Sequence, residues 1–224
     1  MTRPLGALRP LVKASVHAVC VALVAVPALM SWVEARLHPH GEGVFAFWAH
    51  VFALGPGLPG VCLRRAFYQL TLDVCTANFI IGFGAIFTHR RAEVEEDVYI
   101  GPYALIGSAS LRKGCLIGSR ASLLSGGALH ALDDQGRWKP SDFARSIQIE
   151  VGEHAWIGEG AIIIASVGSG AMIAAGSVVA SPVPDSVQMA GNPARFVRWL
   201  RPDGAVGAAD AGKRSHEARI LSLH

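Results

Sequence analysis

An aliphatic residue followed by glycine recurs along the middle of the chain at spacings close to six residues. These dipeptides begin at Ile81, Ile100, Ile106, Ile117, Val151, Ile157 and Val167. Ile173-Ala174 and Val179-Ala180 continue the same period. A period of six matches neither the 3.6-residue repeat of a helix nor the two-residue alternation of a strand. It is typical of a parallel β-helix, in which each hexad forms one short strand and a corner.

The hexads carry the residue types that such a solenoid requires. The first position is aliphatic and is expected to point inward and to stack on its equivalent one turn along, about 4.8 Å away. The fifth position is small, which suits a crowded corner; it is occupied by Ala85, Ala104, Ser110, Ala121, Ala155, Ala161, Ala171 and Ser177. An ordinary sheet protein with many Ile-Gly turns is the alternative, and the number of repeats argues against it.

Two of the breaks in the period predict loops. Ile81 and Ile100 are one residue further apart than three hexads, so His89, Arg90 and Arg91 are predicted to bulge outward. After Leu123 the chain leaves the repeat for residues 124–148, a polar segment that contains glycine. Connections of this length in compact domains are usually functional, so this excursion is the predicted catalytic loop.

The first third of the chain accounts for a mean hydropathy of +0.38, which is high for a soluble protein. Residues 14–33 carry no charge, are long enough to span a bilayer, and follow Arg3, Arg9 and Lys13, which favours a cytoplasmic N-terminus. A second uncharged run, residues 44–63, is interrupted by glycine and proline at 55–60 and suits a re-entrant or interfacial helix. A cleaved signal peptide is the rival reading of the first run, although no clear cleavage site precedes Glu34.

Three regions follow from these patterns. Residues 1–72 are predicted to be a hydrophobic, helical, membrane-associating region, and residues 73–200 the β-helix, with a short C-terminal helix. Residues 201–224 form a tail that is predicted to be disordered, since it is rich in Gly, Ala and Asp. The expected location is the cytoplasmic side of the inner membrane, with a soluble cytoplasmic protein as the alternative.

Charge and cysteine content exclude some classes of function. The net charge of +3 has no clustered basic stripe, which argues against a nucleic-acid partner. Cys20, Cys62, Cys75 and Cys115 include no CxxC pair. This spacing indicates neither a zinc site nor a disulfide framework, and it fits a reduced compartment.

His130 in the excursion is the candidate general base. A neutral imidazole there can take a proton from an acceptor hydroxyl, and Asp133, three residues on, can fix its tautomer. Phe87, Ile106 and Leu123 are expected to stack, which places His89 about two turns, roughly 10 Å, from the excursion. We therefore predict that His89 and Arg90 line the acceptor pocket.

With these motifs the chain resembles the hexapeptide-repeat acyltransferases of the left-handed β-helix class, similar to the maltose and galactoside O-acetyltransferases and to those of colanic-acid-type exopolysaccharide clusters. HALD places His130 on the family's catalytic histidine, Trp156-Ile157-Gly158 matches its WIG motif, and Gly191 to Arg195 matches its closing GNPAR. The family's basic residue after the last hexad is missing here, where residues 179–184 read VASPVP.

The resemblance implies a mainly β fold, a homotrimer, and acetyl-CoA or another acyl-CoA as co-substrate, without a metal. It implies direct transfer to a hydroxyl of a saccharide or a lipid-linked polysaccharide precursor. The CoA-binding residues that it implies are Trp156, Ala175, Ser177, Asn192, Arg195 and Arg198. Asn78 and Asp97 are candidates for holding the acceptor.

Two other classes of function remain open. A β-helix can serve as a noncatalytic scaffold that anchors a membrane assembly, although a scaffold needs neither His130 nor the Arg195-Arg198 pair. A γ-class carbonic anhydrase would use histidines such as His89, His130 and His154, but the HxxxxH spacing of those zinc sites is absent.

Overall fold

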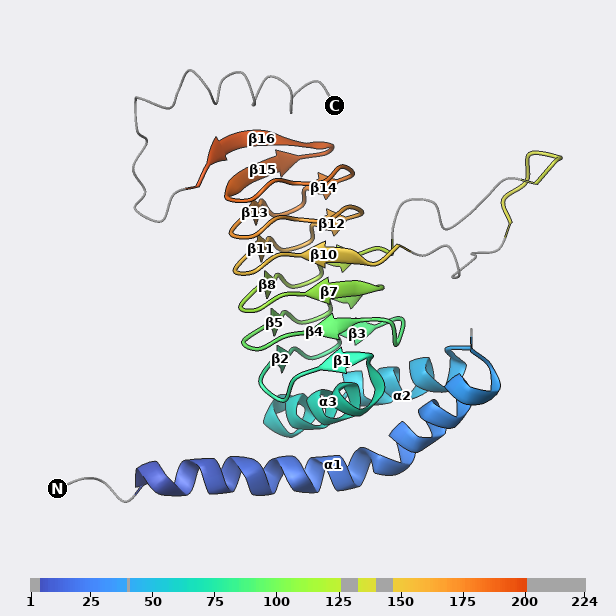
Figure 1. Cartoon of the computed structure of the whole chain (residues 1–224), viewed down its shortest axis with the longest axis vertical. Helices are drawn as coiled ribbons and strands as arrows, with labels where there is room; N and C mark the ends of the chain where they lie inside the picture. Colours follow the sequence, from blue (N-terminus) through green and yellow to red (C-terminus); the bar gives the residue numbers. More distant parts are fainter. Residues whose placement is uncertain (1–4, 40, 126–132, 140–146, 201–224) are drawn as a thin grey trace.

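The protein is a parallel β-helix with three helices packed on its N-terminal end (Figure 1). The computed structural model describes residues 5–39, 41–125, 133–139 and 147–200.

Three sheets run along the solenoid. The first sheet holds β1 (Val74–Cys75), β4 (Glu93–Val94), β7 (Ala109–Leu111) and β10 (Ile149–Val151). The second holds β2 (Ile80–Ile81), β5 (Tyr99–Ile100), β8 (Leu116–Ile117), β11 (Trp156–Ile157), β13 (Met172–Ile173), β15 (Val187–Gly191) and β16 (Ala194–Trp199). The third holds β3 (Ile86–Phe87), β6 (Leu105–Ile106), β9 (Ser122–Leu123), β12 (Ile162–Ile163) and β14 (Val178–Val179).

Inward aliphatic residues stack in register along each sheet, which confirms the hexad prediction. Ile81 pairs with Ile100, and Ile100 pairs with Ile117. In the third sheet Phe87, Ile106 and Leu123 stack as predicted. All of these side chains are buried, and so are the small corner residues such as Ala85 and Ala104. The core is therefore a set of stacked columns, and every strand backbone pairs with the turn before or after it.

Successive turns approach each other so closely at the second hexad position that a side chain does not fit there. A Cβ on Gly118 would lie 2.6 Å from the backbone nitrogen of Glu159, and one on Gly158 would lie 2.5 Å from that of Ala175. The glycine in the Ile-Gly dipeptide is thus required by this close approach of the next turn.

Three helices close the N-terminal end: α1 (Leu5–Leu37), α2 (Gly43–Ala53) and α3 (Gly57–Thr71). Phe45 of α2 and Phe67 of α3 are buried against each other, with ring centroids 5.8 Å apart. The hydroxyl of Tyr68 in α3 accepts a hydrogen bond from the backbone N–H of Phe87 in β3. The helices thereby cover the hydrophobic end that the first turn would otherwise expose.

The opposite end is closed by a hairpin, and the predicted short C-terminal helix is wrong for this part of the chain. Residues 194–199 form β16, which pairs antiparallel with β15. The last turn of a solenoid leaves an edge of unpaired backbone groups, and a strand satisfies that edge whereas a helix does not. Residues 201–224, the predicted disordered tail, lie outside the described residues.

Candidate functional site

The excursion leaves and re-enters the solenoid at one corner, and hydrogen bonds join its two ends. The N–H of Ile147 donates to the carbonyl of Ser125 over 3.2 Å. The Oγ of Ser125 accepts a 2.7 Å hydrogen bond from the N–H of Ser108, which lies at the same corner one turn earlier. The carbonyl of Ser108 in turn accepts from the N–H of Ile149. The base of the loop is thus held to the solenoid, while His130 lies outside the described residues and its role stays a prediction.

Replacing Ser125 with alanine is expected to lower the free energy of unfolding by about 1–3 kcal/mol, because the buried N–H of Ser108 loses its acceptor. Urea unfolding measures this change. Ser122→Ala, on the half-buried outer side of β9, is the matched control and is expected to have a small effect. Equal effects of the two variants would show that the hydrogen bond does not hold the loop base.

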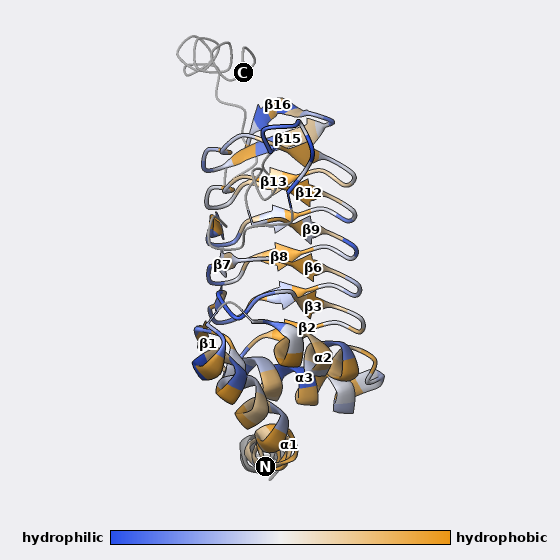
Figure 2. Ribbon diagram, turned by 90° about the vertical axis from the view of Figure 1, so that its right-hand side faces the viewer, coloured by the Kyte–Doolittle hydropathy of each residue, from blue (hydrophilic) through white to orange (hydrophobic). Residues whose placement is uncertain are grey.

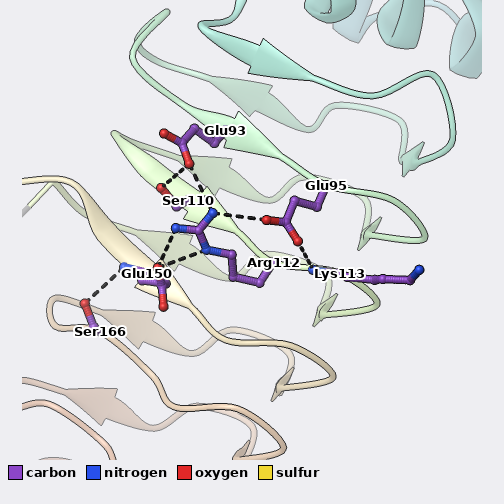
Figure 3. Close-up of polar contacts among 7 residues, drawn as sticks. All are labelled: Glu93, Glu95, Ser110, Arg112, Lys113, Glu150 and Ser166. Atoms are coloured by element: carbon purple, nitrogen blue, oxygen red, sulfur yellow. Dashed lines mark hydrogen bonds and ion pairs between the residues drawn. The ribbon is translucent and has the colours of Figure 1, made fainter.

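An ion-pair network on the outer face of the first sheet holds the strand to which the excursion returns (Figure 3). Arg112 donates from Nε and Nη2 to Glu150 of β10 over 2.9 and 2.7 Å. Its Nη1 reaches Glu93 and Glu95 of the preceding turn. The backbone N–H of Glu150 donates to Ser166 Oγ on the following turn. The network therefore links the turns on both sides of the excursion, although its exposed charges contribute little energy individually.

Asp133 organises the middle of the excursion as a tight turn. Its Oδ1 accepts from the backbone N–H groups of Gln135 and Arg137, both over 2.9 Å, and its Oδ2 accepts from Arg137 Nε. The backbone hydrogen bond from Arg137, aided by its guanidinium, lowers the pKa of Asp133. Both carboxylate oxygens therefore have local partners, and the predicted pairing of Asp133 with His130 stays a prediction.

The bulge, the excursion and the C-terminal corner all lie at the edge between the third and the first sheet. The bulge of residues 88–92 lies between β3 and β4, as predicted, because Phe87 and Val94 keep their registers. The excursion lies at the same edge two turns further on, after Leu123. Two turns beyond it, residues 180–182 occupy this edge, after Val179. The register therefore aligns His89, the excursion and the C-terminal corner along one side of the protein.

A hollow of about 180 Å³ lies at this C-terminal corner and includes Arg195. Its other lining residues are Val179, Ala180, Ser181, Pro182, Met189 and Ala194. The exposed guanidinium of Arg195 donates to the carbonyl of Ala194, and Arg198 Nε donates to Gln188 Oε1 over 2.7 Å.

The remaining predicted CoA-binding residues are found at or near this end of the solenoid. The Oγ of buried Ser177 accepts from the N–H of Gly191, next to exposed Asn192. Ala175 is exposed beyond β13, and Trp156 is 49% exposed on β11 of the second sheet. The structure therefore joins the Ser177 turn to the hairpin, and the CoA-binding roles of these residues stay predictions.

The predicted acceptor residues fall in two separate places. Asn78 donates to Asp97 over 2.6 Å, and both line a second hollow of about 280 Å³, together with Lys13 and Arg65. This hollow lies between the first and second sheets, whereas the excursion lies between the third and the first. Within one chain, therefore, Asn78 and Asp97 do not share the edge of the excursion.

Arg90 and His89 differ in their surroundings although they are neighbours in the bulge. Arg90 forms ion pairs with Glu34 and Glu42 and also donates to Ser31 Oγ, so its guanidinium joins the bulge to the helices. Partial burial lowers the pKa of His89, which favours a neutral imidazole near pH 7. Their roles in acceptor binding stay predictions. The Arg90–Glu34 contact is not predictable from the sequence, where its one sign is an acidic residue near the end of an apolar run.

Comparisons with known proteins place these features in a family. No family model matches the chain. A Saccharomyces cerevisiae protein named "Putative acetyltransferase YJL218W" is 37% identical over 140 residues, which cover 58% of this chain and 67% of that protein. Serine acetyltransferase 2 of Arabidopsis thaliana is 38% identical over 129 residues, which cover 52% of this chain but 37% of the plant protein.

Solved structures show the same fold at low sequence identity. A maltose O-acetyltransferase from Clostridium difficile 630 aligns with a TM-score of 0.55 at 17% identity, over 70% of this chain and 85% of that one. The hexapeptide-repeat containing acetyltransferase VCA0836 from Vibrio cholerae aligns with a TM-score of 0.50 at 18% identity, over 69% and 90% of the two chains.

The hexad repeat, the parallel β-helix and these relatives together show that the chain belongs to the hexapeptide-repeat acetyltransferase family. It is accordingly an enzyme of the acyltransferase class.

Proposed function

We propose that this protein transfers an acyl group, most simply acetyl, from an acyl-CoA to a hydroxyl of a saccharide or a lipid-linked saccharide precursor. The observation that carries the proposal is the excursion with His130, held at its base by Ser125 on a β-helix of this family. The acceptor class extends the resemblance to the saccharide O-acetyltransferases.

The proposed reaction is a direct transfer. His130 takes the proton of the acceptor hydroxyl while the hydroxyl oxygen attacks the thioester carbonyl of the acyl-CoA. Backbone N–H groups of residues 125–127 stabilise the oxyanion of the tetrahedral intermediate. The intermediate then collapses to the ester as the CoA thiolate leaves and takes the proton from the imidazolium. Binding both substrates together supplies a large part of the rate gain.

Two of the four cysteines, Cys75 and Cys115, are poor candidates for an acyl-enzyme nucleophile. Burial raises the pKa of Cys115 and that of Cys75 to about 12. A thiol with such a pKa is almost wholly protonated near pH 7 and is a weak nucleophile. We therefore propose a ternary complex rather than a covalent intermediate.

We propose a homotrimer with acyl-CoA bound near the corner that holds Arg195. Several large apolar side chains project from the outer faces of the second and third sheets, which favours contact between solenoids. They are Ile80, Tyr99, Leu105, Leu116, Trp156 and Ile162. We further propose that α1–α3 place the enzyme on the cytoplasmic face of the inner membrane, where lipid-linked precursors are available.

Titration of acetyl-CoA into the detergent-purified protein tests the donor site. We expect micromolar binding, and Arg195→Ala is expected to weaken it about tenfold through the loss of a charge-assisted contact to a phosphate. Lys113→Ala, which removes an exposed cation at the corner between β7 and β8, is the matched control and is expected to bind normally. No binding of any acyl-CoA to the folded protein would favour the noncatalytic scaffold.

A further inference from the structure

The helical end of the protein presents a large apolar surface that the rest of the described chain does not cover. Residues 12–37 of α1 are long enough to cross a membrane, and their most apolar 18-residue window has a mean hydropathy of 2.1, yet this window is only 28% buried. Figure 2 shows hydrophobic residues along α1, α2 and α3 at the N-terminal end. The large exposed side chains of α1 are Val12, Val16, Val19, Leu23, Val26, Leu29, Met30, Trp32, Val33 and Leu37. Phe47 and Val51 of α2 and Leu58 of α3 extend this surface, which we name the helical base.

The two ends of α1 meet the same end of the solenoid. Lys13 lines the hollow that Asn78 and Asp97 form on the first turns. Glu34, about 30 Å further along the helix axis, pairs with Arg90 on the bulge of the first turn. A helix with both ends on the base of the solenoid runs across that base, as Figure 1 shows, and not away from it along the solenoid axis.

The buried side of α1 supports this placement. Cys20, Val24, Ala28 and Ser31 form a buried stripe over three turns of the helix, and α1 packs extensively on α3. If α1 crossed a bilayer with this packing kept, α3 and the first turn would enter the hydrocarbon with it. The exposed guanidinium of Arg91 would then lose water at a high cost.

We propose that the helical base docks in one leaflet of a membrane, with α1 parallel to the membrane plane and not across it. The proposal deepens the membrane association of the proposed function, and it is independent of the acyl-transfer chemistry. Lys13 and Arg65, at the rim of the hollow beside the helical base, then lie at the level of the lipid phosphates. Arg36, whose guanidinium lies 4.5 Å from the ring centroid of Trp32, occupies the same level near the other end of α1.

A lipid leaflet fits this surface better than a second copy of α1. Some of the exposed residues of α1 form a stripe from Val12 to Val33, at alternating spacings of four and three residues. A second helix could cover this stripe. Leu29 and Trp32 lie on a different side of α1, however, and a helix pair would leave them in water. No charged residue between positions 14 and 33 provides the polar outer face of a soluble helix pair. A leaflet covers all of these residues at once.

Depth measurements on the full-length protein in phospholipid vesicles test the orientation. Bimane is attached to a single cysteine at Val16, Leu23 or Met30, in a variant whose four native cysteines are alanine and whose acetyl-CoA binding and circular dichroism match the wild type. Lipids brominated at defined acyl positions then report the depth of each probe. An in-plane helix gives similar depths at all three sites. A spanning helix places Leu23 about 10 Å deeper than the other two sites, and that result overturns the proposal.

A matched pair of charge substitutions tests the surface itself. Val26→Glu places a carboxylate on the helical base, where the side chain is 65% exposed, and is expected to weaken vesicle binding in flotation about tenfold or more. Val197→Glu makes the same change at a 52% exposed site on β16, at the far end of the solenoid, and is expected to leave vesicle binding unchanged. Equal flotation of the two variants overturns the proposal, as does a wild-type protein that self-associates through α1 without binding vesicles.

Acetyl-CoA titration of the same two variants separates this proposal from the proposed function. Val26→Glu is expected to bind acetyl-CoA as the wild type does. A protein that binds vesicles normally but binds no acyl-CoA refutes the donor site and leaves the docking surface standing.

Discussion

Replacing His130 with alanine is expected to lower kcat for acetyl transfer by a factor of about 10²–10⁴ and to leave acetyl-CoA affinity nearly unchanged. The imidazole is the proposed acceptor of the hydroxyl proton, so its loss raises the barrier of the chemical step and not the energy of donor binding. Steady-state kinetics with a saccharide acceptor, together with calorimetric titration of acetyl-CoA, separates the two effects.

His154→Asn is the matched control for this variant. His154 is exposed at a solenoid corner with a φ of 54°, a left-handed conformation that asparagine tolerates. The His154→Asn variant is expected to retain nearly full acetyl-transfer activity. If His130→Ala keeps wild-type kcat, or if both variants lose it equally, the assignment of the general base is wrong.

Replacing Arg64 with methionine is expected to lower the free energy of unfolding by about 3–5 kcal/mol. This arginine is fully buried where α3 meets α2 and β2. Its Nη1 donates to the carbonyls of Phe52, Ala53 and Gly55, and its Nε donates to that of Ile81. Burial lowers the pKa of Arg64, but the carbonyls at the C-terminal end of α2 favour a positive charge.

Methionine fills a similar volume but donates no hydrogen bond, so these buried or partly buried carbonyls lose their partner. Urea unfolding of the two forms measures the loss. Arg65→Met, at the next and only partly buried position, is the control and is expected to cost much less. A change below about 1 kcal/mol for Arg64→Met would mean that water or backbone movement replaces the lost donors.

The solenoid could be predicted from the sequence because its signal is local and repeated. Ile81, Ile100 and Ile117 each open a hexad, and the extra residue before Ile100 correctly indicated the bulge at His89–Arg91. The excursion after Leu123 was found in the same way, as an interruption of the period. Each of these inferences needed only the order of neighbouring residues.

The predicted C-terminal helix was wrong because the secondary structure of that segment depends on the strand beside it. The segment at Ala194–Trp199 does not carry a strong period of its own, and the open edge of β15 selects a strand there. The ion pairs of Arg90 with Glu34 and Glu42, residues far from it in the sequence, were not predicted either, while its role in lining the acceptor pocket stays a prediction.

The order of residues was enough to predict the β-helix, its turns, the position of the excursion and the apolar character of residues 14–33, because a short repeat and an uncharged run can be recognised without knowledge of contacts. Three features became clear from the three-dimensional structure alone: α1 lies across the base of the solenoid, Arg64 joins α2 to β2, and Asn78 and Asp97 lie on a different edge from the excursion. These features depend on contacts between residues distant in the chain, and the hexad period carries no information about such contacts.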